Sequence, residues 1–407
     1  MYLQSSKYRL KRKSPRRFNL ALIFILCVLI AAAALFQSYV VPIIPPLFLP
    51  SPTATRPAAS YADDAGKLFL DGKLKNSIEM YQQAILLAPT NSDLYVALSR
   101  VQIFSHDYQG ALENAQNAVL RSKSAIAYAV YGEALYRLDL SQGKITFEDA
   151  DKQLRKSLDL DPTLALTHAY YAEMLMDVDY ANWKTASAEA RTAITLAPNL
   201  MESHRALGYI LLQTGNYTEA LSEYQIAIDK HGKLADLWIP TGDCYQDLLE
   251  TQKAIDAYLE ASTYDPSDPT PFGRISRAYA KEGQYGKSAQ SAETAVTLAP
   301  LDPTYRGLLG EMYYFNHEFD KAITQLTLAI VGGGVDQGQV QGLPLQAGRV
   351  AEYYYVYGLA LAKVGRCSDA IPIFQLLQQQ LPDDSDVMEN VTAGLLLCKV
   401  ITPTPGG

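Results

Sequence analysis

The chain has 407 residues, of which 48% are hydrophobic and 19% are charged, and its formal net charge is -8. Length alone suggests two or three globular domains. Residues 1–17 contain seven cations and no acid, so the remainder carries a formal charge of -15. Such an acidic surface argues against electrostatic binding of nucleic acid or anionic lipid and favours basic or neutral partners, although the charge also fits solubility alone.

The amino-terminal region contains an apolar segment that is long enough to cross a bilayer. Residues 20–36 are 17 uninterrupted apolar residues within the wider stretch 18–41. The basic residues before it predict a cytoplasmic amino terminus, a single membrane span and an extracytoplasmic remainder. The alternative is secretion after signal cleavage, because Ala32 and Ala34 form an A-x-A-like site.

A proline-rich segment follows the apolar one. Residues 42–60 contain six prolines, at positions 42, 45, 46, 50, 52 and 57. Proline at this density favours an extended spacer over a packed element.

Beyond this spacer, one pattern of about 34 residues recurs nine times up to residue 384. Each copy has a small residue in a first predicted helix, at Ala65, Ser99, Gly132, Ala172, Gly208, Gly242, Ser276, Gly310 and Gly358. The second predicted helix has one at Ser77, Ala111, Ala150, Ala186, Ala220, Ala254, Ser288, Ala322 and Ala370. Seven residues later comes another small residue in every copy except the last, which has Leu377. Small residues on one helical face let a neighbouring helix approach closely.

The pattern resembles the tetratricopeptide repeat, which reads W-x2-L-G-x2-Y, then A-x3-F-x2-A, then P. The best copy has Trp238, Gly242 and Tyr245 in the first helix, followed by Ala254, Tyr258, Ala261 and Pro266. The resemblance implies an all-α fold, a right-handed superhelical solenoid of about nine helical hairpins. Its units span 58–91, 92–125, 125–164, 165–200, 201–234, 235–268, 269–302, 303–336 and 351–384.

A solenoid needs a covered end. Residues 385–400 are predicted to form a capping helix, and 401–407 a disordered tail. Cys367 and Cys398 fall where the last unit meets this cap, so we expect a disulfide between them if the repeats face an oxidising compartment. Two buried free thiols are the alternative.

The chain lacks the residue patterns of common enzymes. It has no G-x-S-x-G and no phosphate-binding loop, and no histidine pair has metal-ligand spacing. We therefore expect no catalysis, no cofactor and no metal site.

The resemblance also implies that the first helices line a concave groove that binds peptides or proteins. Candidate binding residues are Arg100, Glu133, Tyr136, Glu173, Tyr209, Asp243, Arg277, Glu311 and Tyr355. Because Glu133, Glu173 and Asp243 are acidic, a basic segment is the expected ligand, and a merely solvated groove is the alternative. A Gly/Gln-rich insertion at 332–348 lies before Tyr355 and is expected to be a flexible loop or a second contact region.

Two classes of function remain open. One is a membrane-anchored scaffold or adaptor that binds other proteins outside the cytoplasm through its groove. The other is a structural or self-assembling solenoid of the cell envelope. The sequence leaves the oligomeric state and the identity of any partner undetermined.

Overall fold

The computed structural model describes residues 19–40, 56–144 and 146–400. It separates into two units, which meet at Arg56 and Pro57 and are described one at a time. The predicted basic tail, residues 42–55 of the predicted spacer and the predicted tail after residue 400 lie outside the described residues.

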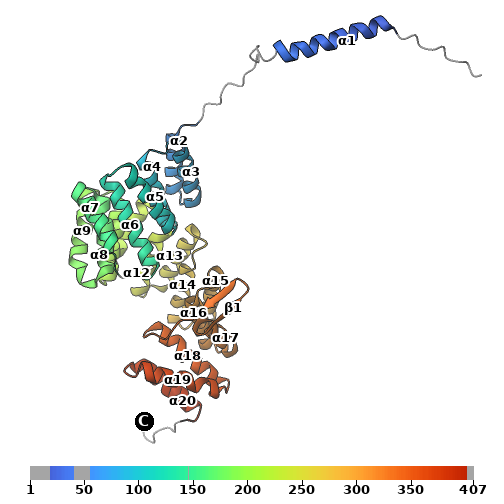
Figure 1. Cartoon of the computed structure of the whole chain (residues 1–407). Coiled ribbons are helices and arrows are strands. Elements are labelled where there is room, and N and C mark those ends of the chain that lie inside the picture. The colour runs from blue at the N-terminus through green and yellow to red at the C-terminus, as the bar shows by residue number, and fades with distance from the viewer. Residues whose placement is uncertain (1–18, 41–55, 145, 401–407) are drawn as a thin grey trace, which may run out of the picture. The chain divides into compact units, whose positions relative to one another are not determined.

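The first unit contains a single apolar helix. Helix α1 (Leu20–Leu35) continues into a π-helical turn, η1 (Phe36–Val40), as Figure 1 shows. The segment Leu20–Ser38 is 19 residues long and contains an 18-residue window with a mean hydropathy of 2.8, none of which is buried. By length and composition this helix is able to cross a membrane. A membrane span and a signal sequence share these properties.

The second unit consists of consecutive helix pairs and one short hairpin of strands (Figure 1). The first four pairs are α2 (Ala58–Leu70) with α3 (Leu74–Leu87), α4 (Ser92–Phe104) with α5 (Tyr108–Arg121), α6 (Ala125–Ser141) with α7 (Glu148–Leu160), and α8 (Ala165–Val178) with α9 (Trp183–Leu196), the last joined through the short η2 (Tyr180–Asn182). The next three are α10 (Met201–Gln213) with α11 (Tyr217–His231), α12 (Ala235–Asp247) with α13 (Thr251–Tyr264), and α14 (Thr270–Lys281) with α15 (Tyr285–Leu298). The chain then forms α16 (Pro303–Phe315) with α17 (Phe319–Ile330), α18 (Arg349–Lys363) with α19 (Cys367–Gln380), and the terminal helix α20 (Ser385–Leu397).

The small residues of the repeat lie where the two helices of a pair touch. A Cβ added at Gly242 would lie 2.4 Å from the ring of Tyr258 in the next helix, so that position has no room for a side chain. Where serine replaces alanine, its hydroxyl is satisfied by the partner helix: Ser99 donates to the carbonyl of Ala111 at 2.7 Å. Leu377, which departs from the pattern, is fully buried in the carboxy-terminal core.

The residue that opens a repeat makes a contact that the motif does not reveal. His168, His204 and Trp238 each place a ring nitrogen 2.7 to 3.0 Å from the carbonyl of the residue six positions earlier. This hydrogen bond ties the start of each first helix to the preceding turn. The polar ring atom therefore has a partner, as a largely buried group requires.

The Gly/Gln-rich insertion contains regular structure, whereas a flexible loop had been expected. Strands β1 (Gly332–Val335) and β2 (Gly338–Gln341) pair in antiparallel register, with Gly333 opposite Val340. The amide of Leu343 then donates to the carbonyl of Ala329 in α17 at 2.9 Å. Glycines with positive φ at Gly332 and Gly338 permit the tight backbone path, which few other residues could follow.

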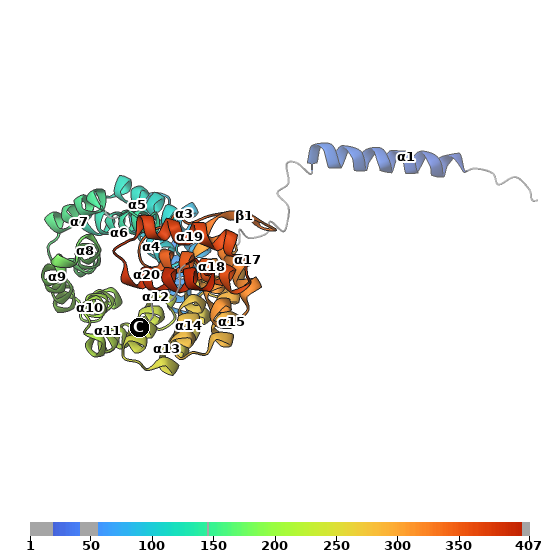
Figure 2. The same cartoon turned by 90° about the horizontal axis from the view of Figure 1, so that it is seen from below.

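First helices form the inner surface of the second unit. In Figure 2, α8, α10 and α12 lie on the inside of an arc, and α9, α11 and α13 lie outside them. First helices of successive pairs also contact one another, as α4 does α6 and α6 does α8. The concave surface is therefore built from the helices that carry the predicted binding residues.

Candidate functional site: the concave surface of the repeats

The first part of the concave surface closes on itself. Residues of α2, α3 and α4 pack in one apolar cluster with residues of α10, α11 and α12, which follow them by 97 or more positions. Phe69 lies 4.4 Å, centroid to centroid, from His231 and 5.6 Å from Phe104. Both ring nitrogens of His231 are buried without a hydrogen bond, and burial lowers the pKa of this histidine. We call this contact the closure contact.

Ion pairs surround the closure contact. Lys233 Nζ lies 3.0 Å from Asp71 Oδ1, and His106 Nε2 lies 3.1 Å from Asp236 Oδ1. The hydrogen bond with Asp236 raises the pKa of His106 to about 9, so this histidine is cationic at neutral pH. His106 occupies a left-handed turn position (φ 59°) that is filled by glycine in other repeats, such as Gly215. Its side chain is thereby placed against the sixth repeat.

Next to the closure contact, the predicted acidic residues are neutralised within the chain. Glu133 and Glu173 are buried, and both accept hydrogen bonds from Arg137, with Arg137 Nε 2.7 Å from Glu133 Oε1. Arg205 Nε donates to Glu173 Oε1 at 2.9 Å and lies within ion-pair distance of Glu133. We call these four residues the buried charge network. Both oxygens of Glu173 and Oε1 of Glu133 are bonded to these arginines, and Glu133 Oε2 is buried without a hydrogen-bond partner.

The other candidates in this part of the groove are also paired. Arg100 forms an ion pair with the buried Glu202. Burial raises the pKa of Glu202, but the Arg100 cation lowers it more, so this pKa lies below its ordinary value. Tyr136 donates to Asp177 at 2.6 Å, and Tyr209 donates to the other oxygen of the same carboxylate. Burial raises the pKa of both tyrosines, so both remain protonated donors.

Two adjoining cavities lie along the inner helices. The first has a volume of about 500 Å³, and its lining includes Tyr108, Tyr209 and Asp236. The second has a volume of about 460 Å³ and shares Leu212, Gln213, Asp243 and Arg274 with the first. Because they share these residues, the two cavities adjoin, and we call them together the inner groove.

The second cavity differs from the first in how its charged side chains are paired. Asp243 accepts a hydrogen bond from Tyr258 at 2.7 Å and lies 3.2 Å from Arg274 Nε. Arg277 and Lys281 also line this cavity, and neither forms an ion pair with any described residue. Arg349, from the helix after the insertion, completes the lining. The structure therefore brings the predicted Asp243 and Arg277 together and adds cations that were not among the predicted binding residues.

The remaining two candidates lie further along the concave side. Glu311 has one carboxylate oxygen that is buried without a partner, and burial, followed by the nearby Glu352, raises its pKa to about 7. Tyr355 is half-buried and packs against the carboxy-terminal core, and burial raises its pKa to about 12. Neither residue lines the inner groove.

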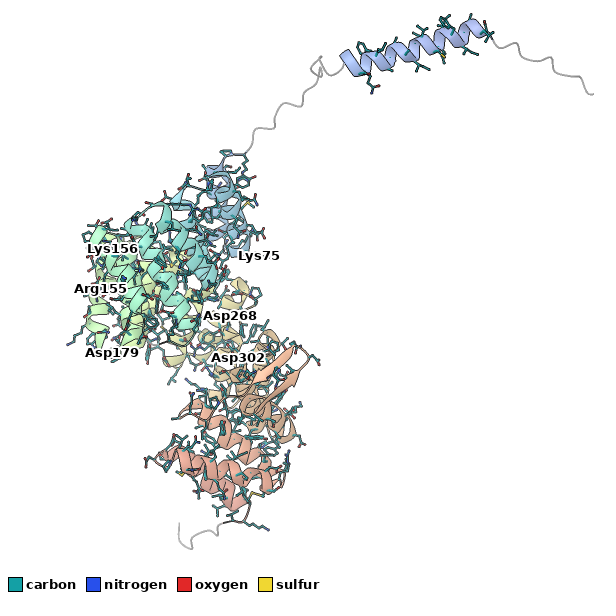
Figure 3. All side chains as sticks on the ribbon, in the orientation of Figure 1. Lys75, Arg155, Lys156, Asp179, Asp268 and Asp302 are labelled. Carbon is teal, nitrogen blue, oxygen red and sulfur yellow. A yellow bond between two sulfur atoms is a disulfide. The ribbon has the colours of Figure 1, made fainter. Side chains whose placement is uncertain are left out.

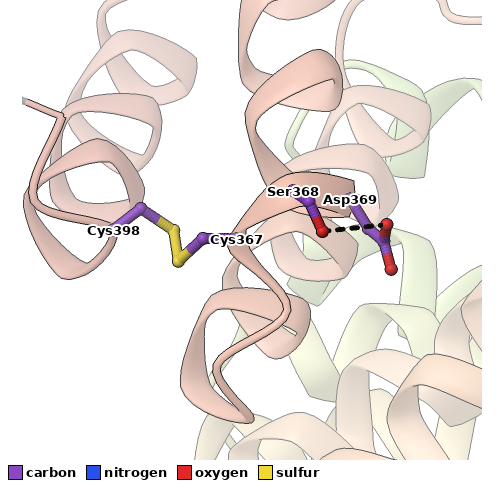
Figure 4. Close-up of a disulfide and its surroundings, with 4 residues drawn as sticks. All are labelled: Cys367, Ser368, Asp369 and Cys398. Atoms are coloured by element: carbon purple, nitrogen blue, oxygen red, sulfur yellow. Dashed lines mark hydrogen bonds between the residues drawn. A yellow bond between two sulfur atoms is a disulfide. The ribbon is translucent and has the colours of Figure 1, made fainter.

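The capping helix is joined to the last pair by a covalent bond. Cys367, the first residue of α19, and Cys398, directly after α20, form a disulfide with a Cα–Cα distance of 5.5 Å (Figure 4). Cys244 is a buried free thiol in α12.

The outward surface carries charges of a different kind. Arg155 and Lys156 of α7 point away from the concave side (Figure 3), and the Arg155 side chain is 62% exposed. Within the described ranges, no group of three or more His, Cys, Asp or Glu side chains is arranged to hold a metal ion.

Sequence reasoning missed the cations that neutralise the groove. Arg137 follows Glu133 by four residues on one helix, a spacing at which side chains meet, so this pair was available from the sequence. Arg205 and Glu202 come from a different repeat than their partners Glu173 and Arg100. No local pattern indicates these contacts.

The repeats match a known family model. Residues 181–235, 205–269 and 274–335 match the family model of the tetratricopeptide repeat. These segments extend from η2 to β1, so this part of the chain carries tetratricopeptide repeats stacked as helical hairpins.

Particular relatives contain similar repeats. The chain is 20% identical over 149 residues to a tetratricopeptide repeat-containing protein, trd-1, of Caenorhabditis elegans, covering 37% of this chain and 18% of that protein. It is 21% identical over 250 residues to the BBSome complex member BBS4 of Bos taurus, covering 61% of this chain and 45% of that protein. It is 24% identical over 200 residues to the general transcriptional corepressor ssn6 of Schizosaccharomyces pombe, covering 48% of this chain and 17% of that protein. The chain thus spans less than half of the length of each relative.

Two solved structures are similar to this chain, each with a sequence identity below 25%. The pilF protein of Pseudomonas aeruginosa is 19% identical, with a TM-score of 0.46, and the match covers 57% of this chain and 98% of that one. A thermophilic TPR protein of Thermus thermophilus is 22% identical, with a TM-score of 0.39, covering 47% and 99%.

Proposed function

We propose that the protein is a scaffold or adaptor that is held at a membrane by residues 18–41 and binds other proteins through the concave surface of its repeats. The inner groove is the observation that carries this proposal. Its two adjoining cavities, of about 500 and 460 Å³, are lined by charged and polar side chains from several repeats. A surface of this kind suits an extended protein segment, which contacts several helices at once.

The finer architecture is part of the proposal. The repeats are taken to form a right-handed superhelix of nine units that is capped by α20. The amino terminus is cytoplasmic and the repeats are extracytoplasmic in this arrangement. The basic residues in 1–17 and the apolar α1 support that orientation, and the Cys367–Cys398 disulfide is compatible with an oxidising compartment.

Crosslinking in intact cells tests the adaptor role. The full-length protein is crosslinked and purified, and the attached proteins are identified by mass spectrometry. We expect the same few partners to be enriched in replicate experiments and to be lost when excess purified full-length protein competes. If the crosslinked species contain only copies of this chain, the self-assembling solenoid replaces the adaptor.

Topology is tested separately from partner binding. In sealed cells, external protease should degrade the repeats but spare an amino-terminal tag. In unreduced peptides from the same cells, Cys367 and Cys398 should be found joined. Two free thiols together with protection of the repeats would place the repeats in the cytoplasm. Release of the repeats into the medium, with an amino terminus just after Ala34, would instead indicate a cleaved signal sequence.

A further inference from the structure

The charges of the second cavity follow from the spacing of residues on two helices. Arg274, Arg277 and Lys281 are separated by three and four positions on α14, so their side chains share one helical face. Arg349 reaches the same cavity from the first turn of α18. Four cations therefore line a space whose lining carboxylates are Asp243 and Asp247, and Glu311 acts on Arg277 and Arg349 from outside that lining.

These cations are incompletely neutralised. Arg274 is engaged by Asp243 at 3.2 Å, and Arg349 Nη1 lies 3.4 Å from Glu352 at the edge of hydrogen-bond distance. Within the described residues, Arg277 and Lys281 have no ion pair, and Arg277 Nε is buried without an acceptor. A ligand in the cavity can pair with Arg277 and Lys281, which both line it.

Carboxylates fit these donors. A guanidinium offers parallel N–H groups that match the two oxygens of a carboxylate, and a lysine adds a point charge. The adjoining first cavity contributes the tyrosines Tyr108 and Tyr209 along the same groove. The combined shape suits an extended chain with acidic side chains at one end better than a compact anion.

We propose that Arg277, Lys281 and Arg349 form a subsite for the carboxylates of an acidic segment in a partner protein. This proposal rests on the proposed adaptor function and names the chemistry of the partner. It replaces the expected basic ligand, because Glu133 and Glu173 are paired with Arg137 and Arg205, whereas Arg277 and Lys281 have no ion pair within the described residues.

Fluorescence anisotropy of labelled peptides tests the subsite. Full-length protein in detergent is titrated into three ten-residue peptides that differ only in four positions, which are Glu, Gln or Lys. We expect the Glu peptide to bind at least tenfold more tightly than the Gln peptide, with affinity falling as salt rises. A preference for the Lys peptide, or equal binding of all three, overturns the proposal. Competition by millimolar inorganic phosphate as effective as that by the unlabelled Glu peptide would mark a simple anion site and also overturn it.

Matched variants place the effect at the subsite. The double variant Arg277→Gln with Lys281→Gln should weaken binding of the Glu peptide at least tenfold. The control, Arg155→Gln with Lys156→Gln, removes the same charge from the outward surface of α7 and should change binding less than twofold. Circular dichroism and the melting temperature show whether each variant is folded. Equal losses in both folded variants overturn the subsite.

The two proposals fail in different ways. If crosslinking enriches partners but the double variant retains them all, the adaptor role stands and the acidic subsite is wrong. If the Glu peptide binds at the subsite but crosslinking finds no partner, the subsite stands and the adaptor role is wrong.

Discussion

The inner side of the repeats has two regions, which differ in whether the charged residues of the first helices are paired within the chain. In the first, from α4 to α10, charged residues of the first helices are paired with each other and largely buried. In the second, from α12 to α18, Arg277 and Lys281 line a cavity and form no ion pair within the described residues. The closure contact accounts for the difference, because it brings α2 and α4 against α10 to α12 and encloses the first region. The same groove position thus serves stability in one region and remains available for binding in the other.

The largest expected effect concerns the buried charge network. Glu173→Gln leaves Arg137 and Arg205 with only Glu133 as a carboxylate partner. Because breaking a buried ion pair strands a charge, we expect the free energy of unfolding to fall by about 3–5 kcal/mol. Urea unfolding followed by circular dichroism measures it. As a control, Lys253→Gln breaks an exposed pair with Glu250 and should leave the free energy of unfolding nearly unchanged, because solvent screens such a pair. Equal small losses would mean that the network does not stabilise the fold.

An intermediate effect is expected at the closure contact. Phe69→Ala removes the ring that contacts His231 and Phe104, and should cost about 1–3 kcal/mol because Phe69 is only partly buried. Amide hydrogen exchange should also become faster between residues 227 and 237. The neighbouring Leu70 is 56% exposed, so Leu70→Ala is the matched control and should leave exchange there unchanged. If Phe69→Ala leaves this exchange unchanged, the closure contact does not explain the difference between the two regions.

The smallest effect concerns Glu311 and depends on pH. The folded pKa of about 7 lies above the ordinary value, because the carboxyl is buried and faces Glu352, while Arg277 and Arg349 oppose the rise. The folded state therefore binds more protons than the unfolded state between these two pKa values, so the free energy of unfolding falls as pH rises through that window.

Glu311→Gln removes this loss. At each pH, we compare the free energy of unfolding of the variant with that of the unaltered protein. We expect this difference to shift in favour of the variant by about 1–3 kcal/mol from pH 5 to pH 8. Urea unfolding at the two pH values gives the difference. The control variant, Glu389→Gln, removes a carboxyl that is exposed on α20. A pH-independent result for Glu311→Gln would mean that this carboxyl is solvated.

Much of the repeat could be predicted because its contacts are local. Gly242 and Tyr258 lie on the two helices of one hairpin, and their close approach follows from a motif within a single unit. Cys367 and Cys398 are separated by 31 residues, about one repeat, so the stacking of hairpins was enough to suggest their pairing. The strands β1 and β2 were missed because glycine and glutamine favour neither alternation nor burial.

The amino-acid sequence by itself determined the helix pairs, the inner position of the first helices and the apolar character of α1, because each depends on spacing within about one repeat. Only the tertiary structure decided which charges of the concave surface are free. The partners of Asp71, Arg100 and His106 lie 102 to 162 positions away, and they meet only because the stack curves until its first repeats reach α10 to α12. Curvature accumulates from small rotations between successive hairpins, and no single unit encodes it.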